Sequence, residues 1–258
     1  MSIFSDIAKV WKNYGTTILG GVGNTMLIAL VGTVAGLIIG LINGIIRTIP
    51  KPKNAFLRNL LAAVNFLITA YVEVFRGTPM MVQAMIIYWG YAYANGGKTL
   101  PLIPAGIVIV SINTGAYITE IVRGGIIAID RGQFEGAAAI GMNHTQTMLY
   151  VVIPQVMRTI LPSVSNEFVV NIKDTSVLNV IGVTELFFYA ASAAKNSYKI
   201  FAAYLIACII YFMLTFTVTR LLKLVERLLE GKGNYVIFGS QSSSEAEIRV
   251  TEAENGDN

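Results

Sequence analysis

The sequence contains very little of the chemistry that enzymes and metal sites use. It has one cysteine, Cys208, and one histidine, His144, among its 258 residues. A single cysteine excludes an internal disulfide and a cysteine-based metal cluster, and one histidine excludes a histidine-rich metal site. We interpret Cys208 as a small packing residue and His144 as a loop contact.

Charged residues are scarce as well, and this decides the class of protein. They make up 13% of the chain, against 54% hydrophobic residues, and the mean hydropathy is +0.63. A soluble domain carries about 25% charged residues. The sequence therefore predicts an all-α integral membrane protein. At about 20 residues per crossing it has room for five or six spans and little for a separate soluble domain.

Four segments have the length and composition of membrane spans, namely 25–46, 101–122, 156–172 and 200–222. The region 54–94 is harder to interpret, because its length fits either two crossings or one long broken helix. At its centre, Gly77 and Pro79 interrupt the hydrogen-bond ladder of a helix.

Positive charge favours one net crossing in this region. With five spans, the basic residues of the connections divide by side, eleven against five. Cytoplasmic connections are enriched in Lys and Arg. We therefore expect an outside N-terminus, a cytoplasmic C-terminus and a cytoplasmic loop around Glu135. The larger set is Arg47, Lys51, Lys53, Arg58, Arg123, Arg131, Arg158, Arg220, Lys223, Arg227 and Lys232, and the smaller is Lys9, Lys12, Lys98, Lys195 and Lys199.

The two ends differ from the membrane domain, which we place at residues 19–232. Residues 1–18 mix apolar residues with Lys9 and Lys12, an amphipathic pattern suited to the membrane interface. They lack the basic start and the cleavage site of a signal peptide. Residues 233–258 are acidic and rich in serine, which predicts a disordered cytoplasmic tail.

The loop between the third and fourth spans carries a motif. It resembles the cytoplasmic coupling loop of ABC-transporter permease subunits, whose pattern is E-A-A, three residues, G, nine residues, I-x-L-P. The residues in register are Glu135, Ala137, Gly141 and Pro154. Gly136 stands where the family has Ala. These five residues are the predicted contacts with an ATPase, because a short helix of small residues can seat in a partner's groove.

Further blocks narrow the resemblance to the polar amino-acid uptake permeases of the histidine, glutamine and arginine type. Residues 71–83 look like the family signature E-x-x-R-G-T-P-x-x-x-Q. Residues 166–186 are similar to its N-E-F … K-D-T-S-L-L … G … E-L run, with Val177 in place of Leu. Residues 116–125 match the pattern A-Y … E … R-G-G. Matched blocks in the right order are far more specific than any one alone.

The resemblance implies the type I ABC importer permease fold in a bacterial inner membrane. It also implies a second permease subunit, identical or paralogous, a cytoplasmic ATPase dimer and an external solute-binding protein that delivers a polar amino acid; no nucleic acid is expected. The chain has no nucleotide-binding motif. We therefore expect a transport subunit without a cofactor or enzymatic activity of its own, with ATP and Mg²⁺ bound by the ATPase subunits.

Ionisable residues at membrane depth are expensive and normally face a protein interior or a wet cavity. Glu167 meets this criterion, and the predicted substrate pathway consists of Glu73, Arg76, Gly77, Thr78, Gln83, Glu120, Lys173, Asp174, Thr175 and Ser176. Glu73 with Arg76, and Glu120 with Arg123, could instead form ion pairs on one helix face, because each pair is three residues apart. The Gly77–Pro79 break could expose backbone groups to a substrate carboxylate or could be a simple kink.

The run from Lys173 to Ser176 is the first choice for substrate contact. An amino acid presents an ammonium and a carboxylate, so its site needs an anion close to hydrogen-bond donors. Asp174 supplies the anion, and Thr175 and Ser176 supply hydroxyls. The alternative is that Asp174 and Thr175 cap a short helix.

Other classes of protein fit the sequence less well. A gradient-driven secondary transporter would need neither the Glu135 loop nor an ATPase, and no inverted repeat is visible. A channel would need a repeated carbonyl-rich filter segment, which we do not find. An enzyme would need a nucleophile with a base, and the chain offers no such set.

Overall fold

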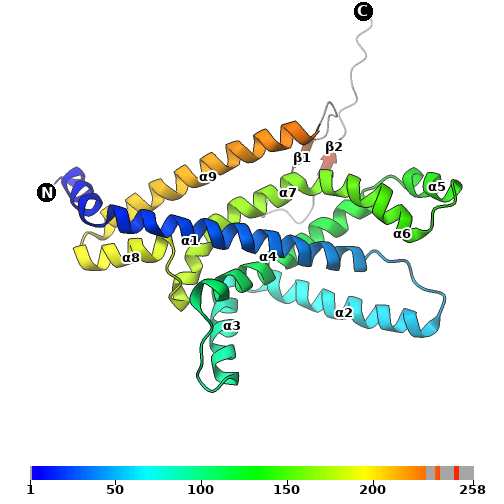
Figure 1. Ribbon diagram of the computed structural model, residues 1–258, viewed down its shortest axis with the longest axis horizontal. Coiled ribbons are helices and arrows are strands. Elements are labelled where there is room, and N and C mark those ends of the chain that lie inside the picture. Colours follow the sequence, from blue (N-terminus) through cyan, green and yellow to red (C-terminus); the bar gives the residue numbers. More distant parts are fainter. Residues whose placement is uncertain (1, 231–235, 239–246, 250–258) are drawn as a thin grey trace, which may run out of the picture.

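The computed structural model describes residues 2–230, 236–238 and 247–249 (Figure 1). Its elements are α1 (Ile3–Ile46), α2 (Ala55–Gly77), α3 (Met80–Ala94), α4 (Leu102–Ile127), α5 (Arg131–Ala139), α6 (His144–Gln146), the π-helix η1 (Thr147–Val152), α7 (Ile153–Asp174), the 3₁₀-helix η2 (Thr175–Ile181), α8 (Leu186–Ser197), α9 (Ile200–Glu230), β1 (Val236–Phe238) and β2 (Glu247–Arg249). Every element within residues 2–230 is helical, as the composition predicts.

Five helical runs of the described residues are long and apolar enough to cross a membrane. They are Ile3–Ile46, Ala55–Gly77, Leu102–Ile127, His144–Ile181 and Ile200–Leu228. The four predicted spans coincide with four of these runs, with the span 101–122 beginning one residue before Leu102, and the fifth run is α2. Helix α3 has 15 residues, fewer than the roughly 20 that a crossing needs. The prediction of five spans is confirmed.

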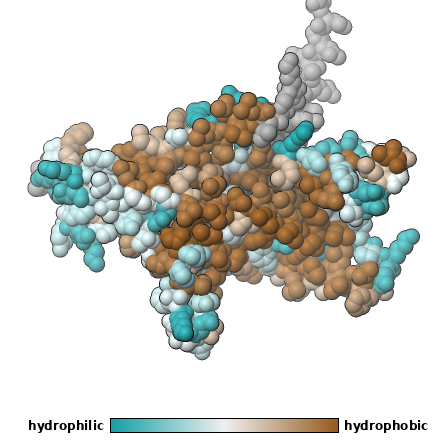
Figure 2. Space-filling view, viewed as in Figure 1, coloured by the Kyte–Doolittle hydropathy of each residue, from teal (hydrophilic) through white to brown (hydrophobic). Residues whose placement is uncertain are grey.

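The long helices lie roughly along one axis of the molecule, and α3 runs across them (Figure 1). The N-terminus and α8 lie at one end, and the α1–α2 connection lies at the other end with α5 and α6. Hydrophobic residues cover the middle of the visible face, while hydrophilic residues gather at both ends and at the tip of α3 (Figure 2). This distribution is that of a protein with an apolar belt in the bilayer.

Helices α1 and α4 approach each other through a ladder of glycines. Four glycines of α1, each one turn from the next, face four residues of α4 with the same spacing. A Cβ atom on these glycines would lie 2.5–2.9 Å from the α4 side chain, closer than real Cβ contacts allow. The facing pairs are Gly32 with Val110, Gly36 with Thr114, Gly40 with Ile118 and Gly44 with Val122. Small residues at this spacing let two helices pack at short range within a membrane.

A buried glutamate joins α8 to α1 and α9. Glu185 has no exposed surface, and its Oε1 accepts the Phe188 backbone N–H at 2.7 Å, which caps the start of α8. Its Oε2 accepts the Tyr211 hydroxyl of α9 at 2.7 Å and the Thr25 hydroxyl of α1 at 3.3 Å. Burial raises the pKa of this carboxyl, and these hydrogen bonds act against that rise. The contacts fix the connection between the fourth and fifth spans.

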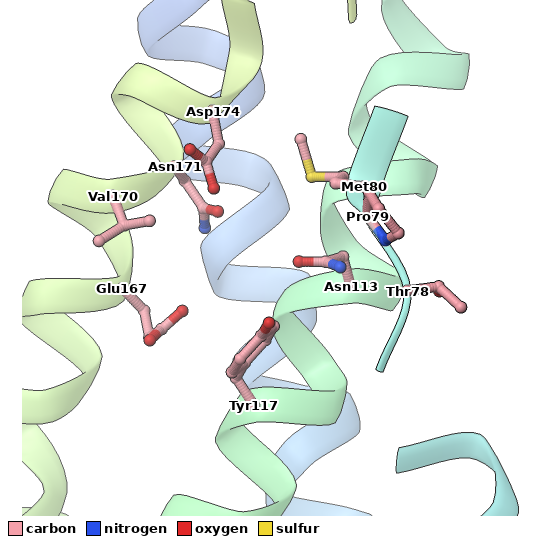
Figure 3. A pocket seen from close by; sticks show the side chains of 9 residues that line it. All are labelled: Thr78, Pro79, Met80, Asn113, Tyr117, Glu167, Val170, Asn171 and Asp174. Carbon is pink, nitrogen blue, oxygen red and sulfur yellow. The ribbon is translucent and has the colours of Figure 1, made fainter. Parts of the chain in front are cut away.

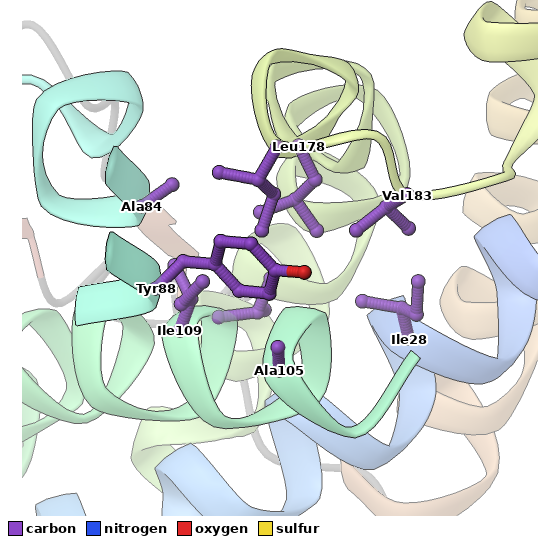
Figure 4. Close-up of a cluster of buried hydrophobic side chains, with 9 residues drawn as sticks. Ile28, Ala84, Tyr88, Ala105, Ile109, Leu178 and Val183 are labelled. Atoms are coloured by element: carbon purple, nitrogen blue, oxygen red, sulfur yellow. The ribbon is translucent and has the colours of Figure 1, made fainter. Parts of the chain in front are cut away.

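Helix α3 is held across the bundle by an apolar cluster. Tyr88 and Ala84 of α3 pack in one cluster with Ile109 of α4, Leu178 of η2 and Ile28 of α1 (Figure 4). All five side chains are buried. Since η2 follows directly after Asp174, this cluster also fixes the segment next to that carboxylate.

The N-terminal segment is continuous with the first span, which differs from the predicted boundary at residue 18. No proline interrupts the chain before Pro50, and α1 runs without a break from Ile3 to Ile46. Val10 and Ile18 are buried against α8 and α9, beside Leu186 and Ala203. Val10 and Ile18 thus pack on protein, whereas Ile3, Phe4 and Trp11 are exposed, and the placement of this segment at the membrane interface stays a prediction.

Most of the predicted disordered tail, residues 233–258, lies outside the described residues. The described part is β1 and β2, which pair antiparallel with Ile237 opposite Ile248. At these two strands the structure has backbone pairing where the sequence predicts disorder.

Candidate functional site

The chain between α2 and α3 breaks at Thr78 and Pro79. Proline has no N–H and pushes the preceding residue out of the helical region, and Thr78 is extended, with φ −123° and ψ 149°. The carbonyl groups exposed by this break are capped by Gln83. Its Nε2 donates to the carbonyl oxygens of Phe75 and Thr78, each at 2.9 Å. The break is therefore a hydrogen-bonded structure and not a loose kink.

A cavity of about 170 Å³ opens beside the break. Three elements line it: Thr78, Pro79 and Met80 of the break, Asn113 and Tyr117 of α4, and Glu167, Val170, Asn171 and Asp174 of α7. In Figure 3 the α7 side chains face those of α4 and the break across the opening. Among these lining residues only the proline, the methionine and the valine have apolar side chains, so polar groups dominate the wall.

Two carboxylates make the lining of the cavity acidic. Glu167 and Asp174 are seven residues apart, which is close to two helical turns, and so they lie on one face of α7. Glu167 is only 6% exposed, and Asp174 is half-buried. Two acidic groups on one wall can bind a cation or the ammonium group of a ligand.

An amide between the two carboxylates ties α7 to its neighbours. Asn171 Nδ2 donates to the Thr33 hydroxyl of α1 at 2.8 Å and to the Thr114 hydroxyl of α4 at 2.9 Å. All three residues are buried. Because Thr114 also faces the glycine ladder, this contact sets the position of the acidic wall against the rigid α1–α4 pair.

The cation of Arg76 lies close to the cavity without lining it. The Arg76 guanidinium carbon is 5.4 Å from the centre of the Tyr117 ring, a cation–π distance. Among the ion pairs of the described helices, none joins Arg76 to Glu73, so the predicted alternative pairing of these two residues is wrong. Both side chains are exposed in this single subunit.

Of the predicted pathway residues, Thr78 and Asp174 line the cavity. Gln83 is buried behind the break, and Gly77 precedes it. Thr175 is buried and its hydroxyl donates to the Ile172 carbonyl at 3.0 Å, while Lys173 is exposed and Ser176 is half-buried. The alternative in which Asp174 caps the following helix is wrong, because its side chain makes no capping hydrogen bond to η2.

Glu120 lies away from the cavity, in an ion cluster between α1 and α4. Its two oxygens accept from Arg47, at the end of α1, and from Arg123 at 2.9 Å. The predicted alternative of a Glu120–Arg123 pair is confirmed, with Arg47 as an additional partner. This cluster extends the α1–α4 contact beyond the last glycine of the ladder.

Seven lining residues are not among the predicted pathway residues, namely Pro79, Met80, Asn113, Tyr117, Glu167, Val170 and Asn171. The sequence marks Glu167 only as an ionisable group at membrane depth. The spacing of Asn171 from both carboxylates, one turn from each, is a usable signal: polar residues at 167, 171 and 174 form a stripe on a helix.

The predicted coupling segment forms α5. Asp130 caps its start by accepting the Gly132 N–H at 2.6 Å, and Gly141 ends the turn with φ +83°, which glycine adopts without strain. Glu135 and Gly136 are exposed, whereas Ala137 is 5% exposed and packs inward. Helix α5 thus presents one face to solvent and is fixed by the other.

Pro154 lies in the first turn of α7, after a short helical segment that precedes this helix. Helical structure already begins at His144, where the Asn143 side chain and Gln146 form a capping box. The π-helix η1 follows and leads into α7 with Pro154 in its first turn. Proline lacks the N–H that an α-helix needs there, and a π-turn just before it accommodates the change in hydrogen bonding.

These features define a class: a multi-pass helical membrane protein with a polar cavity at a broken helix and a small exposed helix at one end. The model of the family described as "Binding-protein-dependent transport system inner membrane component" matches residues 55–231, and the chain belongs to this family. It is a permease subunit of amino-acid ABC importers and a multi-pass inner-membrane protein, as its motifs predicted.

Curated relatives agree over most of the chain. The glutamine transport system permease protein GlnP of Escherichia coli K12 is 32% identical over 225 residues, which is 87% of this chain and 98% of GlnP. The arginine transport system permease protein ArtQ of Bacillus subtilis is 33% identical over 83% of this chain and 92% of ArtQ.

Solved structures agree with the fold. A crystal structure of an amino acid ABC transporter with histidines has a TM-score of 0.73 and 33% identity, and the match covers 89% of this chain and 99% of that one. The methionine ABC transporter MetNI in an inward-facing conformation has a TM-score of 0.62 at 19% identity over 81% of this chain and 95% of its own, which supports the fold alone.

Proposed function

We propose that the cavity at the helix break is the amino-acid site of this permease. The observation that carries the proposal is the pair of carboxylates, Glu167 and Asp174, on one wall of a cavity at membrane depth. Charged groups there are costly and normally serve a substrate pathway. The ammonium group of the substrate binds this wall, and the start of α3, whose first backbone N–H groups have no helical partner, faces the substrate carboxylate.

The test of this site is uptake by the assembled importer in vesicles. Glu167→Gln and Asp174→Asn each remove one negative charge with little change in shape. We expect each to raise KM for the amino acid at least about tenfold, the loss of one charged hydrogen bond. Glu226→Gln, a change on α9 outside the cavity lining, is the matched control. Wild-type KM values in both cavity variants would refute the site.

We propose further that α5 docks in a groove of a cytoplasmic ATPase dimer, which binds ATP and Mg²⁺. The exposed face with Glu135 and Gly136, together with Ile140 at 75% exposure, supports a protein contact on this side. The chain then works with a second permease subunit, identical or paralogous, and with an external solute-binding protein. The N-terminus is outside and the C-terminus cytoplasmic, an orientation supported by the positive charge around α5.

Coupling is tested by measuring ATP hydrolysis and uptake in the same vesicles. Glu135→Lys reverses the charge on the exposed face, and we expect ATP hydrolysis to continue while uptake falls about tenfold or more. Gly136→Ala is the control, because a Cβ added there meets no atom within 4 Å and Ala is the family's residue at this position. Gly141→Asp is a weaker test, because the φ of +83° at this position strains any residue with a side chain, so a loss of uptake could come from altered folding of the loop. Unchanged uptake with Glu135→Lys would remove α5 from the docking surface.

A further inference from the structure

The side-chain amide of Gln83 can point in only one direction. Its Nε2 lies 2.9 Å from the carbonyl oxygens of both Phe75 and Thr78. The Thr78 hydroxyl, also at 2.9 Å, donates its hydrogen to the Val74 carbonyl and can therefore accept. Turning the amide over would place its oxygen against two carbonyl oxygens, so the nitrogen has to face the break. Gln83 Oε1 consequently faces α4.

Asn113 is oriented by Gln83 in turn. Its Nδ2 lies 2.9 Å from Gln83 Oε1 and 3.4 Å from the Phe75 carbonyl oxygen. Both neighbours are acceptors, so this position requires the NH₂ group. The Asn113 oxygen is left on the opposite side, and Figure 3 shows it directed toward the cavity and α7. Asn113 is 8% exposed, so the oxygen is an almost buried acceptor in the cavity wall.

The second amide of the wall also keeps its donors away from the cavity. Asn171 Nδ2 is occupied by the hydroxyls of Thr33 and Thr114, and its Oδ1 accepts the Thr114 hydroxyl at 3.2 Å. The amide nitrogens of Asn113 and Asn171 are thus both engaged by protein groups, and the Asn113 oxygen with the carboxylates of Glu167 and Asp174 provides the acceptors of the wall. A wall of acceptors suits a ligand that carries several N–H donors.

The charge balance points in the same direction. The lining carries two acidic groups, and Arg76, next to Tyr117, supplies one positive charge nearby. Lys173 supplies a second positive charge, close to Asp174, and like Arg76 it is exposed and outside the lining. The lining itself thus carries two acidic groups and no basic one, which suits an amino acid with a cationic side chain in addition to its ammonium group.

We propose that Gln83 is a positioning residue that turns the Asn113 oxygen toward the cavity, and that this acceptor makes the site selective for amino acids with a cationic side chain. The inference rests on the proposed use of the cavity as the amino-acid site. Asn113 touches the substrate, and Gln83 acts through Asn113 without touching it.

The experiment measures binding to the permease–ATPase complex in nanodiscs without the solute-binding protein, so that the cavity alone selects. Tritiated L-arginine is the probe, with L-glutamine as competitor. We expect wild type to prefer L-arginine by about tenfold or more, the worth of one hydrogen bond to a charged group. Asn113→Ala removes the acceptor, and the arginine-to-glutamine affinity ratio falls by a similar factor. Asn113→Ser, which keeps a hydroxyl near Gln83, is the second variant if Asn113→Ala does not fold.

The variant Gln83→Leu tests whether Gln83 orients Asn113, without changing a residue of the cavity lining. It changes no lining atom, yet it frees Asn113 to turn over, and we expect the same fall in the affinity ratio. A wild-type preference for L-glutamine, or an unchanged ratio in the Asn113 variants, overturns the selectivity proposal while a loss of binding in Glu167→Gln still supports the cavity as the site. An unchanged ratio in folded Gln83→Leu overturns the role of Gln83. Binding that survives both Glu167→Gln and Asp174→Asn refutes the cavity as the amino-acid site, and with it the proposed role of Gln83 and Asn113.

Discussion

The two faces of α4 are built on different principles. On one face, Val110, Thr114, Ile118 and Val122 pack against glycines of α1 with no room for another atom. On the other, Asn113 and Tyr117 line a cavity; Asn113 is held by hydrogen bonds to Gln83 and Phe75, and the Tyr117 ring lies beside Arg76. Close packing against small residues fixes the position of a helix. Hydrogen bonds and ring contacts orient individual side chains and leave space between them for a ligand. The same helix thus serves as a fixed reference and as part of the site.

The largest effect is expected from filling the glycine ladder. Gly40→Val adds atoms where a Cβ alone would lie 2.5 Å from Ile118 Cγ2. We expect a loss of stability of about 3 kcal/mol, at the upper end of overpacking, because both partners are helix backbones that have to separate. The measurement is the melting temperature and the yield of monodisperse protein in detergent.

The control for the ladder lies on the same helix. Gly20 and Gly23 have no atom within 4 Å of an added Cβ. Gly23→Ala should therefore keep or raise the melting temperature, since alanine favours a helix by about 1 kcal/mol. Equal damage from Gly23→Ala and Gly40→Val would mean that close approach to α4 is not the reason for glycine.

A smaller loss of stability is expected at Asn171, which contacts α1 and α4 next to the cavity. Asn171→Leu removes the three hydrogen bonds that tie the acidic wall to Thr33 and Thr114. The expected cost is about 1–2 kcal/mol, because interhelical hydrogen bonds in membranes are individually modest. Substrate affinity should fall more than stability suggests, since the wall loses its position. Asn166→Leu, on the exposed side of α7, is the control for stability, and equal melting temperatures in the two variants would contradict the account.

The smallest expected effect is on the pH dependence of stability, through Glu185. Burial raises the pKa of this carboxyl in the folded protein. Between the unfolded pKa of about 4.3 and the raised folded pKa, the folded state binds more protons, so stability falls as the pH rises through that window. Glu185→Gln cannot titrate and should give a flatter profile of melting temperature against pH. Identical slopes for wild type and variant would assign the pH dependence to other groups.

The sequence was sufficient for the features that depend on local pattern. Apolar length predicted the spans, and Gly77 with Pro79 predicted the break. It was insufficient for the cavity, because a lining residue is defined by what faces it. The Asn113 side chain is oriented by a hydrogen bond to Gln83, which is thirty residues away in the sequence, and no local sequence pattern links the two residues.

Two other features could have been predicted and were not. Gly32, Gly36, Gly40 and Gly44 repeat every four residues in the sequence, which is the pattern of a close helix contact. The absence of proline before Pro50 allowed one long helix where a boundary was placed at residue 18. Of the run Lys173–Ser176, only Asp174 lines the cavity, and the contact of the other three residues with substrate stays a prediction.

The unbroken helical run from α6 through α7 has a mechanical consequence. Asn171 is three residues from Asp174 and twenty-seven from His144, at the end near α5. At about 1.5 Å per residue, a pivot at Asn171 has one arm of about 4–5 Å and another of about 40 Å. About such a pivot, a movement at His144 would be about nine times as large as the matching movement at Asp174. A displacement of several ångströms beside α5 would thus correspond to less than one ångström at the carboxylate of the site.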